Sequence, residues 1–270
     1  MNPTEPIDRA HLRDPRDRRF DLARYSPSAE CVGLVRGYWV PVWSVPHGEA
    51  SDQEVLQYPI CLIVVSNSYA RFYGVVRGLS RTTLVGDGWA FGVMLQPAAG
   101  LLIGGRSVRH FTDRYVDLGE IRGLPGGALS RELGDLMAAG PDDVGIHHRA
   151  IAHFEAALTP LLPIDPEGAS INAIVDYVET DPDVVRVGQI CDRFALTERS
   201  LQRLTQRRLG LGPKWLIRRR RMHEAVSGLK SGDDLAALAA RLGYADQSHF
   251  TRDFKAVTGW TPGRLALRYA

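Results

Sequence analysis

Two kinds of hydrophobic pattern divide the chain. Between residues 25 and about 120 the apolar positions come in short β-rich runs, punctuated by Gly, Pro, Asn and Asp. These runs are 31–43, 54–65, 69–76, 82–95 and 101–105. Several short strands at this spacing predict a small barrel or sandwich. Helical patterns follow at 128–140 and 144–162, and LPIDPEG, 162–168, reads as a linker.

Beyond the linker, one segment occurs twice. LTERSLQRLTQRRLGLGP (196–213) and ADQSHFTRDFKAVTGWTP (245–262) superpose without a gap at an offset of 49 residues. A fixed period indicates one supersecondary unit used more than once. Apolar spacing in each copy predicts two short helices joined by a tight turn, with Thr197 and Asp246 as N-caps. Such a unit is a helix-turn-helix, whose second helix can enter a DNA major groove.

The outward faces of the two second helices carry the side chains that a base reader needs. In the first copy they are Arg199, Gln202, Arg203 and Gln206; in the second they are Gln247, Ser248, Thr251, Arg252 and Lys255. Arg can pair with guanine, Gln with adenine, and Ser or Thr with either base. A generic pair of helices would give the same apolar pattern, but its solvated face would be expected to contain more Glu.

A third helix is predicted between the copies. Pro213 suits its first turn, and the four arginines 218–221 wrap most of its circumference. At most two or three of them can face one partner. We expect Arg218 and Arg219 to contact DNA and at least one arginine only to cap the surface.

The charge distribution agrees with a polyanionic partner. Residues 184–270 contain 17 Lys and Arg against 7 Asp and Glu, whereas the remainder contains 16 against 24. Such asymmetry favours nucleic-acid binding by the basic part, and a merely solvated basic surface is the alternative. The first twenty residues contain no apolar run, and no stretch approaches ~18 apolar residues, so neither a signal peptide nor a membrane span is expected. Three cysteines far apart indicate a reducing cytoplasm.

Residues from about 168 to 270 resemble the DNA-binding domain of the AraC/XylS family of bacterial transcription regulators. The resemblance rests on GYADQSHFTRDFKAVTGWTPGRLALR (243–268), SLQR (200–203) and RRRRMHEA (218–225). It implies seven helices, with two helix-turn-helix units held by a central linker helix. The family's base-facing positions fall here on Arg199, Gln202, Arg203, Gln247, Ser248, Thr251 and Arg252.

Residues 24–43 and 91–105 are similar to a sensor-like domain often found before this type of DNA-binding domain. In AraC-like regulators the front domain is frequently a cupin-like barrel that binds a small effector or mediates dimerisation. The resemblance therefore implies an α+β protein with two domains, a β-rich cupin-like barrel with flanking helices followed by the all-α DNA-binding domain. The expected divisions are a charged arm (1–24), the sensing or dimerisation domain (25–161), the linker (162–168) and the DNA-binding domain (169–270).

No catalytic or metal site is predicted. His47 and His110 are isolated, and His147 and His148 are helix neighbours that point in different directions. Neither a metal-binding cupin nor a nucleophilic triad fits, so no cofactor is expected. Trp39, Trp43, Tyr58 and Trp89 are candidates to line an effector pocket, and ordinary core packing is their alternative. Leu133, Leu136, Phe154 and Leu158 lie either between protomers of a homodimer or against the chain's own barrel.

The sequence thus predicts a cytoplasmic, nucleoid-associated transcription regulator that is not an enzyme. Its expected partners are double-stranded DNA, a small effector, a second copy of itself and, for an activator, RNA polymerase. The rival hypothesis is a ligand-binding or enzymatic cupin-like barrel whose basic tail binds nucleic acid without sequence preference.

Overall fold

The structure, a computed structural model, describes residues 10–12 and 19–269. The charged arm expected at 1–24 therefore falls mostly outside the described residues. From Phe20, however, its last residues form the first strand, β1, which pairs with β2 over its whole length. The sequence pattern did not predict this strand.

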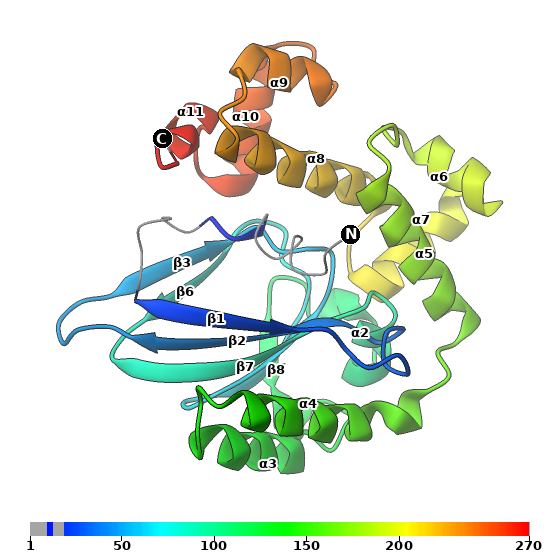
Figure 1. Cartoon of the computed structure of the whole chain (residues 1–270). Helices are drawn as coiled ribbons and strands as arrows, with labels where there is room; N and C mark the ends of the chain where they lie inside the picture. Colours follow the sequence, from blue (N-terminus) through cyan, green and yellow to red (C-terminus); the bar gives the residue numbers. More distant parts are fainter. Residues whose placement is uncertain (1–9, 13–18, 270) are drawn as a thin grey trace.

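The amino-terminal part of the described chain is built from two antiparallel sheets (Figure 1). The larger sheet has the order β1-β2-β7-β4-β5-β8, and β3 pairs with β6 alone. The strands are β1 (Phe20–Tyr25), β2 (Val35–Ser44), β3 (Ser51–Val55), β4 (Leu62–Ser66), β5 (Ala70–Tyr73), β6 (Ser80–Leu84), β7 (Asp87–Leu95) and β8 (Tyr115–Asp117). The β-rich prediction is confirmed. Within the described residues, the two sheets face each other without joining into one closed ring of hydrogen bonds.

Alternation along the strands gives the larger sheet two different faces. On β7, Trp89, Phe91 and Val93 join a core that also contains Leu133 and Phe154 from the helices beneath the sheet. These helices are α3 (Gly126–Ala138) and α4 (Val144–Leu158) (Figure 1). Successive side chains of a strand point to opposite faces, so the residues between them face the two-stranded sheet instead.

The predicted helices at 128–140 and 144–162 thus exist, and their apolar residues belong to this core. Leu133, Phe154 and Leu158 are fully buried there, and Leu136 packs against the same cluster. Packing against the chain's own sheet, one of the two alternatives, is therefore the arrangement found. Leu133, Phe154 and Leu158 are therefore not available as contacts between protomers, whereas Leu136 is only partly buried.

The run at 101–105 was predicted to be a strand. It is instead part of helix α2 (Ala99–Gly104). Periodicity cannot distinguish a short buried helix from a buried strand, and the two alanines before this run favour a helix. Three short 3₁₀ turns complete this domain: η1 (Val108–His110), η2 (Leu118–Glu120) and η3 (Thr159–Leu161).

From Pro166 onward the described chain forms seven helices, as the family resemblance implied. They are α5 (Pro166–Thr180), α6 (Val187–Phe194), α7 (Glu198–Leu209), α8 (Pro213–Lys230), α9 (Leu235–Arg241), α10 (Gln247–Thr258) and α11 (Pro262–Ala266). Helix α8 links the α6–α7 unit to the α9–α10 unit, and the helices arch over the sheets (Figure 1).

The repeat in the sequence is a repeat in the backbone. The Thr197 hydroxyl accepts a hydrogen bond from the Ser200 amide at 3.2 Å, and the Asp246 carboxylate accepts one from the His249 amide at 2.7 Å. Both predicted N-caps are thus confirmed. Gly210 ends α7 and Gly259 ends α10, each at φ +76°, where a side chain would be strained.

Candidate nucleic-acid interface and ligand cavity

The predicted reading face of α7 lies on the surface. Arg199, Gln202 and Arg203 are exposed and Gln206 is half-buried, while Leu201 on the opposite side is fully buried. The four polar side chains border an open hollow together with residues of η1 and its flank. The hollow is lined by Ser107, Arg109, Arg199, Gln202, Arg203, Gln206 and Arg207, and contains no carboxylate.

The equivalent face of α10 is similarly open. Gln247, Ser248, Arg252 and Lys255 are exposed, and Thr251 is half-buried. Phe250 and Phe254 hold the other side of the helix in the core. No ion pair occupies Arg199, Arg203, Arg252 or Lys255 in the described part of the chain. Both helices therefore present hydrogen-bonding groups that are available to an external partner.

Of the two arginines expected to contact DNA from α8, Arg219 is buried against the sheet domain in this structure. The residue is 2% exposed, and its guanidinium donates to the carbonyl oxygens of Val76 at 2.8 Å and Arg77 at 2.5 Å. Burial lowers the pKa of Arg219 to about 9, so it still carries its charge at neutral pH. Arg219 joins the two domains, because the turn of α8 on which it lies faces the sheet domain.

A different face of α8 carries partly exposed positive charge, since Lys214 is exposed and Arg218 and Arg221 are half-buried. Lys214, Arg218 and Arg221, spaced i, i+4 and i+7, line a hollow between the two helix-turn-helix units. Arg218 is held by Asp253 at 2.5 Å, and Arg221 lies over the ring of Tyr244. Lys214 and Arg221 were not among the predicted DNA contacts. The spacing that places them on one face of the helix could have identified them, but the run of four arginines has no single face.

The second helix-turn-helix unit is fastened to the two-stranded sheet. Glu54 on β3 is only 8% exposed and accepts hydrogen bonds from the Trp260 indole nitrogen at 2.9 Å and from Arg81 at 3.0 Å. Arg268 approaches the same carboxylate at 3.4 Å. One carboxylate therefore joins β3, β6 and the end of the chain.

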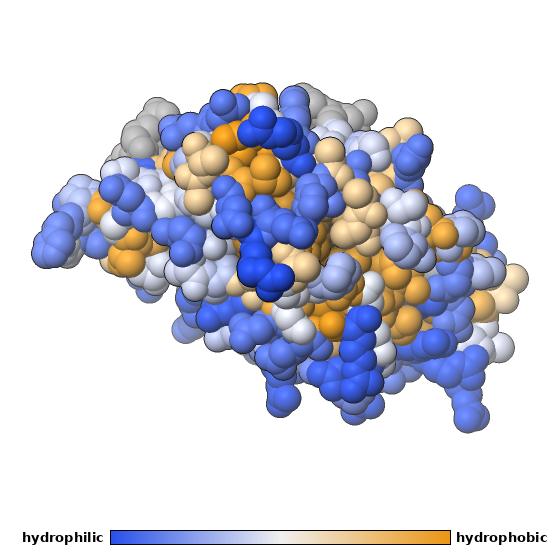
Figure 2. Space-filling model, turned by 90° about the horizontal axis from the view of Figure 1, so that it is seen from below, coloured by the Kyte–Doolittle hydropathy of each residue, from blue (hydrophilic) through white to orange (hydrophobic). Residues whose placement is uncertain are grey.

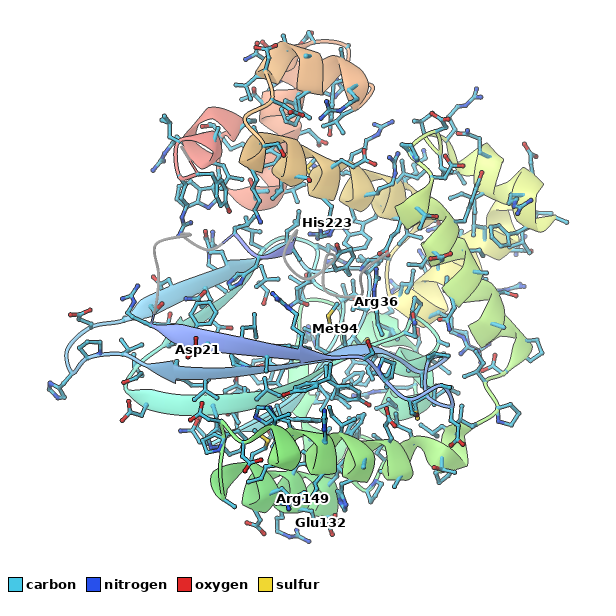
Figure 3. All side chains as sticks on the ribbon, viewed as in Figure 1. Asp21, Arg36, Met94, Glu132, Arg149 and His223 are labelled. Atoms are coloured by element: carbon cyan, nitrogen blue, oxygen red, sulfur yellow. The ribbon has the colours of Figure 1, made fainter. Side chains whose placement is uncertain are left out.

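A stack of rings joins α8 to the sheet domain nearby. The Tyr58 ring lies parallel to the His223 ring, with centroids 4.3 Å apart, and Arg36 covers the other Tyr58 face at 4.4 Å. In Figure 3, His223 extends from α8 toward the sheet domain, with Arg36 and Met94 beneath it. Arg36 also pairs with Glu179 at 2.8 Å, and burial raises the pKa of that carboxyl group.

The first unit makes a charged contact with the start of α5 and a neutral contact with the amino-terminal domain. Arg208 on α7 is buried, and its guanidinium donates to Asp165 at the start of α5. This hydrogen bond is the main reason that the pKa of Asp165 lies below its ordinary value. The Thr112 hydroxyl also donates to the Gly210 carbonyl at 3.4 Å. Both units therefore contact the amino-terminal domain.

A largely apolar cavity of about 190 Å³ lies between the two sheets. Its walls include Phe20, Trp39, Trp43, Gln53, Val55, Gln57, Tyr58, Leu62, Tyr69, Tyr73, Thr82, Leu84, Ala90 and Met94. Three of the four predicted pocket residues, Trp39, Trp43 and Tyr58, therefore line it. Trp89 does not line it, because on β7 it points to the opposite face of the sheet.

The cavity depends on glycines opposite the two tryptophans. Trp39 pairs with Gly92 and Trp43 with Gly88 in the antiparallel register of β2 and β7. A Cβ atom at Gly92 would meet the Trp39 ring at 2.1 Å, and one at Gly88 would meet the Trp43 ring at 2.3 Å. The glycines thus let both indoles lie flat against the sheet and form a cavity wall.

The described residues contain no cluster of three or more His, Cys, Asp or Glu side chains that could hold a metal ion. His147 is buried, with its ring nitrogens 2.6 Å from the Tyr25 hydroxyl and from the Pro141 carbonyl. None of the helices in the described part of the chain is long and apolar enough to cross a bilayer.

Family models match two parts of the sequence. A helix-turn-helix domain matches residues 190–268, and a domain of unknown function matches residues 23–117. The first covers both recognition helices and the second covers all eight strands except the start of β1.

Curated relatives match the carboxy-terminal part. The HTH-type transcriptional activator RhaS of Escherichia fergusonii is 33% identical over 99 residues, which are 36% of each chain. The HTH-type transcriptional regulator NimR of Escherichia coli is 35% identical over 82 residues, which are 30% of each chain. The matched region thus spans about a third of the length of these relatives.

Among solved structures, ToxT from Vibrio cholerae aligns with a TM-score of 0.43 and 12% identity, over 93% of this chain and 99% of that one. ToxT bound to (E)-4-(8-methylnaphthalen-1-yl)but-3-enoic acid aligns with a TM-score of 0.42 and 13% identity, over 94% and 100% of the two chains.

Proposed function

We propose that this chain, whose carboxy-terminal domain belongs to the AraC/XylS family, is a sequence-specific DNA-binding transcription regulator and not an enzyme. One observation carries the proposal. Two copies of the same capped helix, α7 and α10, each present exposed Arg, Gln, Ser or Lys side chains without an ion-pair partner in the described chain. Such side chains can read base edges in the major groove.

In this proposal α7 and α10 read neighbouring major-groove segments on one face of the duplex. Helix α8 has 18 residues, so it is about 27 Å long at ~1.5 Å per residue. Successive major-groove segments are ~34 Å apart. We therefore expect the duplex to bend toward the protein when both helices are engaged. Lys214, Arg218 and Arg221 would then contact the phosphates between the two segments.

The amino-terminal domain is proposed to sense a small effector through the cavity between its sheets. The contacts of Glu54 with Trp260 and of Tyr58 with His223 give the DNA-binding domain a physical connection to the cavity wall. We further propose a cytoplasmic location and, because several relatives are named activators, RNA polymerase as a partner.

Homodimerisation through the sheet domain is also part of the proposal. Figure 2 shows the side on which α3 and α4 lie, where hydrophobic residues emerge between hydrophilic ones. Val144, at the start of α4, is 56% exposed. Sedimentation of the purified protein at micromolar concentration would measure its oligomeric state.

The experiment that tests the function is selection of genomic DNA fragments by the purified protein at about 150 mM salt, since such affinities depend on salt. The expected result is one motif with two half-elements about a helical turn apart. Fragments bound without any shared motif would instead favour the rival hypothesis, a ligand-binding barrel with a nonspecific basic tail.

A further inference from the structure

Among the described residues that line the cavity between the sheets, His11 is the only one whose side chain can carry a charge near neutral pH. Among the described residues that surround it there is no Asp, Glu, Lys or Arg, and aromatic rings form much of the wall. An ion entering this space would lose its hydration without gaining a carboxylate, ammonium or guanidinium partner among the described residues. The volume of about 190 Å³ is also below the ~300 Å³ at which drug-sized pockets begin. The dimensions and chemistry therefore suit a small, uncharged molecule.

One polar atom in the wall lacks a partner. Gln57 is 8% exposed, and its side-chain oxygen is buried without a hydrogen bond to any described residue. Buried acceptors are nearly always paired, because leaving one unpaired is costly. The neighbouring amide of Gln53 is already engaged, with its oxygen 2.8 Å from the His11 ring and its nitrogen donating to Ser51. A small rotation of the Gln57 side chain would turn this oxygen toward the cavity that the residue lines, where a ligand could supply the missing donor.

The wall that carries these groups also holds the DNA-binding domain. On β3, Gln53 and Val55 line the cavity, whereas Glu54 between them accepts the hydrogen bond from Trp260. Tyr58, directly after Gln57, lines the cavity and stacks on His223 of α8. A ligand that displaces this wall would therefore also change the contacts that Glu54 makes with Trp260 and that Tyr58 makes with His223.

We propose that the cavity binds a small, uncharged aromatic molecule that donates one hydrogen bond to Gln57, and that its binding acts on the second helix-turn-helix unit through β3. Aromatic walls favour an aromatic occupant because ring pairs gain more than their buried area alone. The second half of this inference rests on the proposed DNA-binding function, whereas the first half does not.

Phenol and toluene are the probes for the ligand class, because they have similar shapes and differ in one hydroxyl donor. Calorimetric titration of the full chain should show phenol binding roughly tenfold more tightly than toluene, the effect of one hydrogen bond to an otherwise unpaired acceptor. Benzoate, which is charged, should not bind. Equal affinities for phenol and toluene, or binding of benzoate as tight as that of phenol, would overturn the ligand class.

Two variants locate the binding. Gln57→Leu should abolish the preference for phenol and retain toluene binding, because it removes only the acceptor. Ala90→Leu places a larger side chain into the cavity from β7 and should abolish binding of both probes. Phenol binding unchanged in both variants would place the site elsewhere and contradict the proposal.

The effect of ligand binding on DNA affinity is measured with a DNA fragment obtained from the genomic selection. Saturating phenol should change the affinity of the wild-type chain for that fragment by roughly fivefold or more. The change should shrink in Glu54→Gln, which keeps the shape of the side chain but weakens its contact with Trp260 and Arg268. Phenol binding without any effect on DNA affinity would refute the route through β3. Failure to recover any DNA motif would count against the proposed function alone, because the calorimetry needs no DNA.

Discussion

Glu54 and Trp260, 206 residues apart, meet at 2.9 Å across the boundary between the sheet domain and the helical domain. The indole nitrogen donates to a carboxylate that is itself almost fully buried. A charged acceptor at such a position strengthens the hydrogen bond. This contact ties the end of the second helix-turn-helix unit to a strand that also forms a cavity wall.

Replacing Trp260 by Phe should therefore loosen the attachment. The variant keeps an aromatic ring but removes the donor, and hydrogen bonds to charged groups contribute about 1.5 to 3 kcal/mol. We expect faster amide hydrogen exchange in α10 and α11 and a lower midpoint of chemical denaturation. Trp43→Phe is a useful comparison, since that indole donates only at 3.4 Å to the exposed Val85 carbonyl. Equal effects of the two substitutions would contradict the role assigned to Trp260.

Arg203 is expected to contribute to sequence choice. Arg203→Ala should relax discrimination at one base pair by about 1 to 3 kcal/mol while leaving binding of random duplex nearly unchanged. Binding to a set of single-base variants of the selected site measures this. Arg131 on α3, exposed and remote from α7, provides the control substitution. A loss that is equal on specific and random DNA would assign Arg203 to phosphate contact instead.

Lys214 and Arg221 should behave in the opposite way. Each alanine substitution is expected to weaken specific and random DNA alike, and to reduce the slope of log affinity against log salt by about 0.9. Arg219→Ala should leave this slope unchanged, because its guanidinium is bound to carbonyl oxygens of the sheet domain. A reduced slope for Arg219→Ala would show that Arg219 leaves its buried position when DNA binds.

Gly259 should not tolerate a side chain. Its φ of +76° places any L-residue in the left-handed region, at a cost of roughly 1 to 2 kcal/mol. Gly259→Ala should lower the free energy of unfolding by about that amount, measured by chemical denaturation. Gly263, four residues later in α11, has no positive φ and open space around its Cβ position. Gly263→Ala should be neutral or slightly stabilising, and an equal loss at both glycines would exclude backbone strain as the cause.

The Asp165–Arg208 contact predicts a dependence of stability on pH. The hydrogen bond from Arg208 lowers the pKa of Asp165 in the folded state below its unfolded value of about 3.9. The stabilisation is thus fully present above the unfolded pKa and is lost as pH falls through the folded pKa.

Asp165→Asn should lower the free energy of unfolding at pH 7 and flatten its decline in acid. Hydrogen bonds to charged groups are worth about 1.5 to 3 kcal/mol, and we expect the lower end because the Asp165 side chain is 37% exposed. Denaturation between pH 3 and 7 measures both effects. Asp142→Asn, at an exposed position, is the control. An unchanged acid profile in Asp165→Asn would assign the acid dependence to other carboxylates.

The sequence by itself determined the carboxy-terminal architecture, because the information there is local. Caps such as Thr197 and Asp246, and the glycine after each recognition helix, specify backbone conformation within a few residues of themselves. The charge and donor chemistry of α7 and α10 could be read in the same way. The β-rich character of the first domain also followed from short-range patterns.

Only the tertiary structure decided which way individual side chains face once elements pack together. Arg219 and Arg221 are two residues apart in the same helix, yet the sheet domain buries the first and leaves the second beside the hollow on α8. Trp89 was expected to line the same pocket as Trp43, but the two occupy opposite faces of the sheet, because Trp89 pairs with Val42, the residue before Trp43. Glu54 connects the two domains only because folding brings it within hydrogen-bond distance of Trp260. Such contacts join residues far apart in sequence, and no local pattern specifies them.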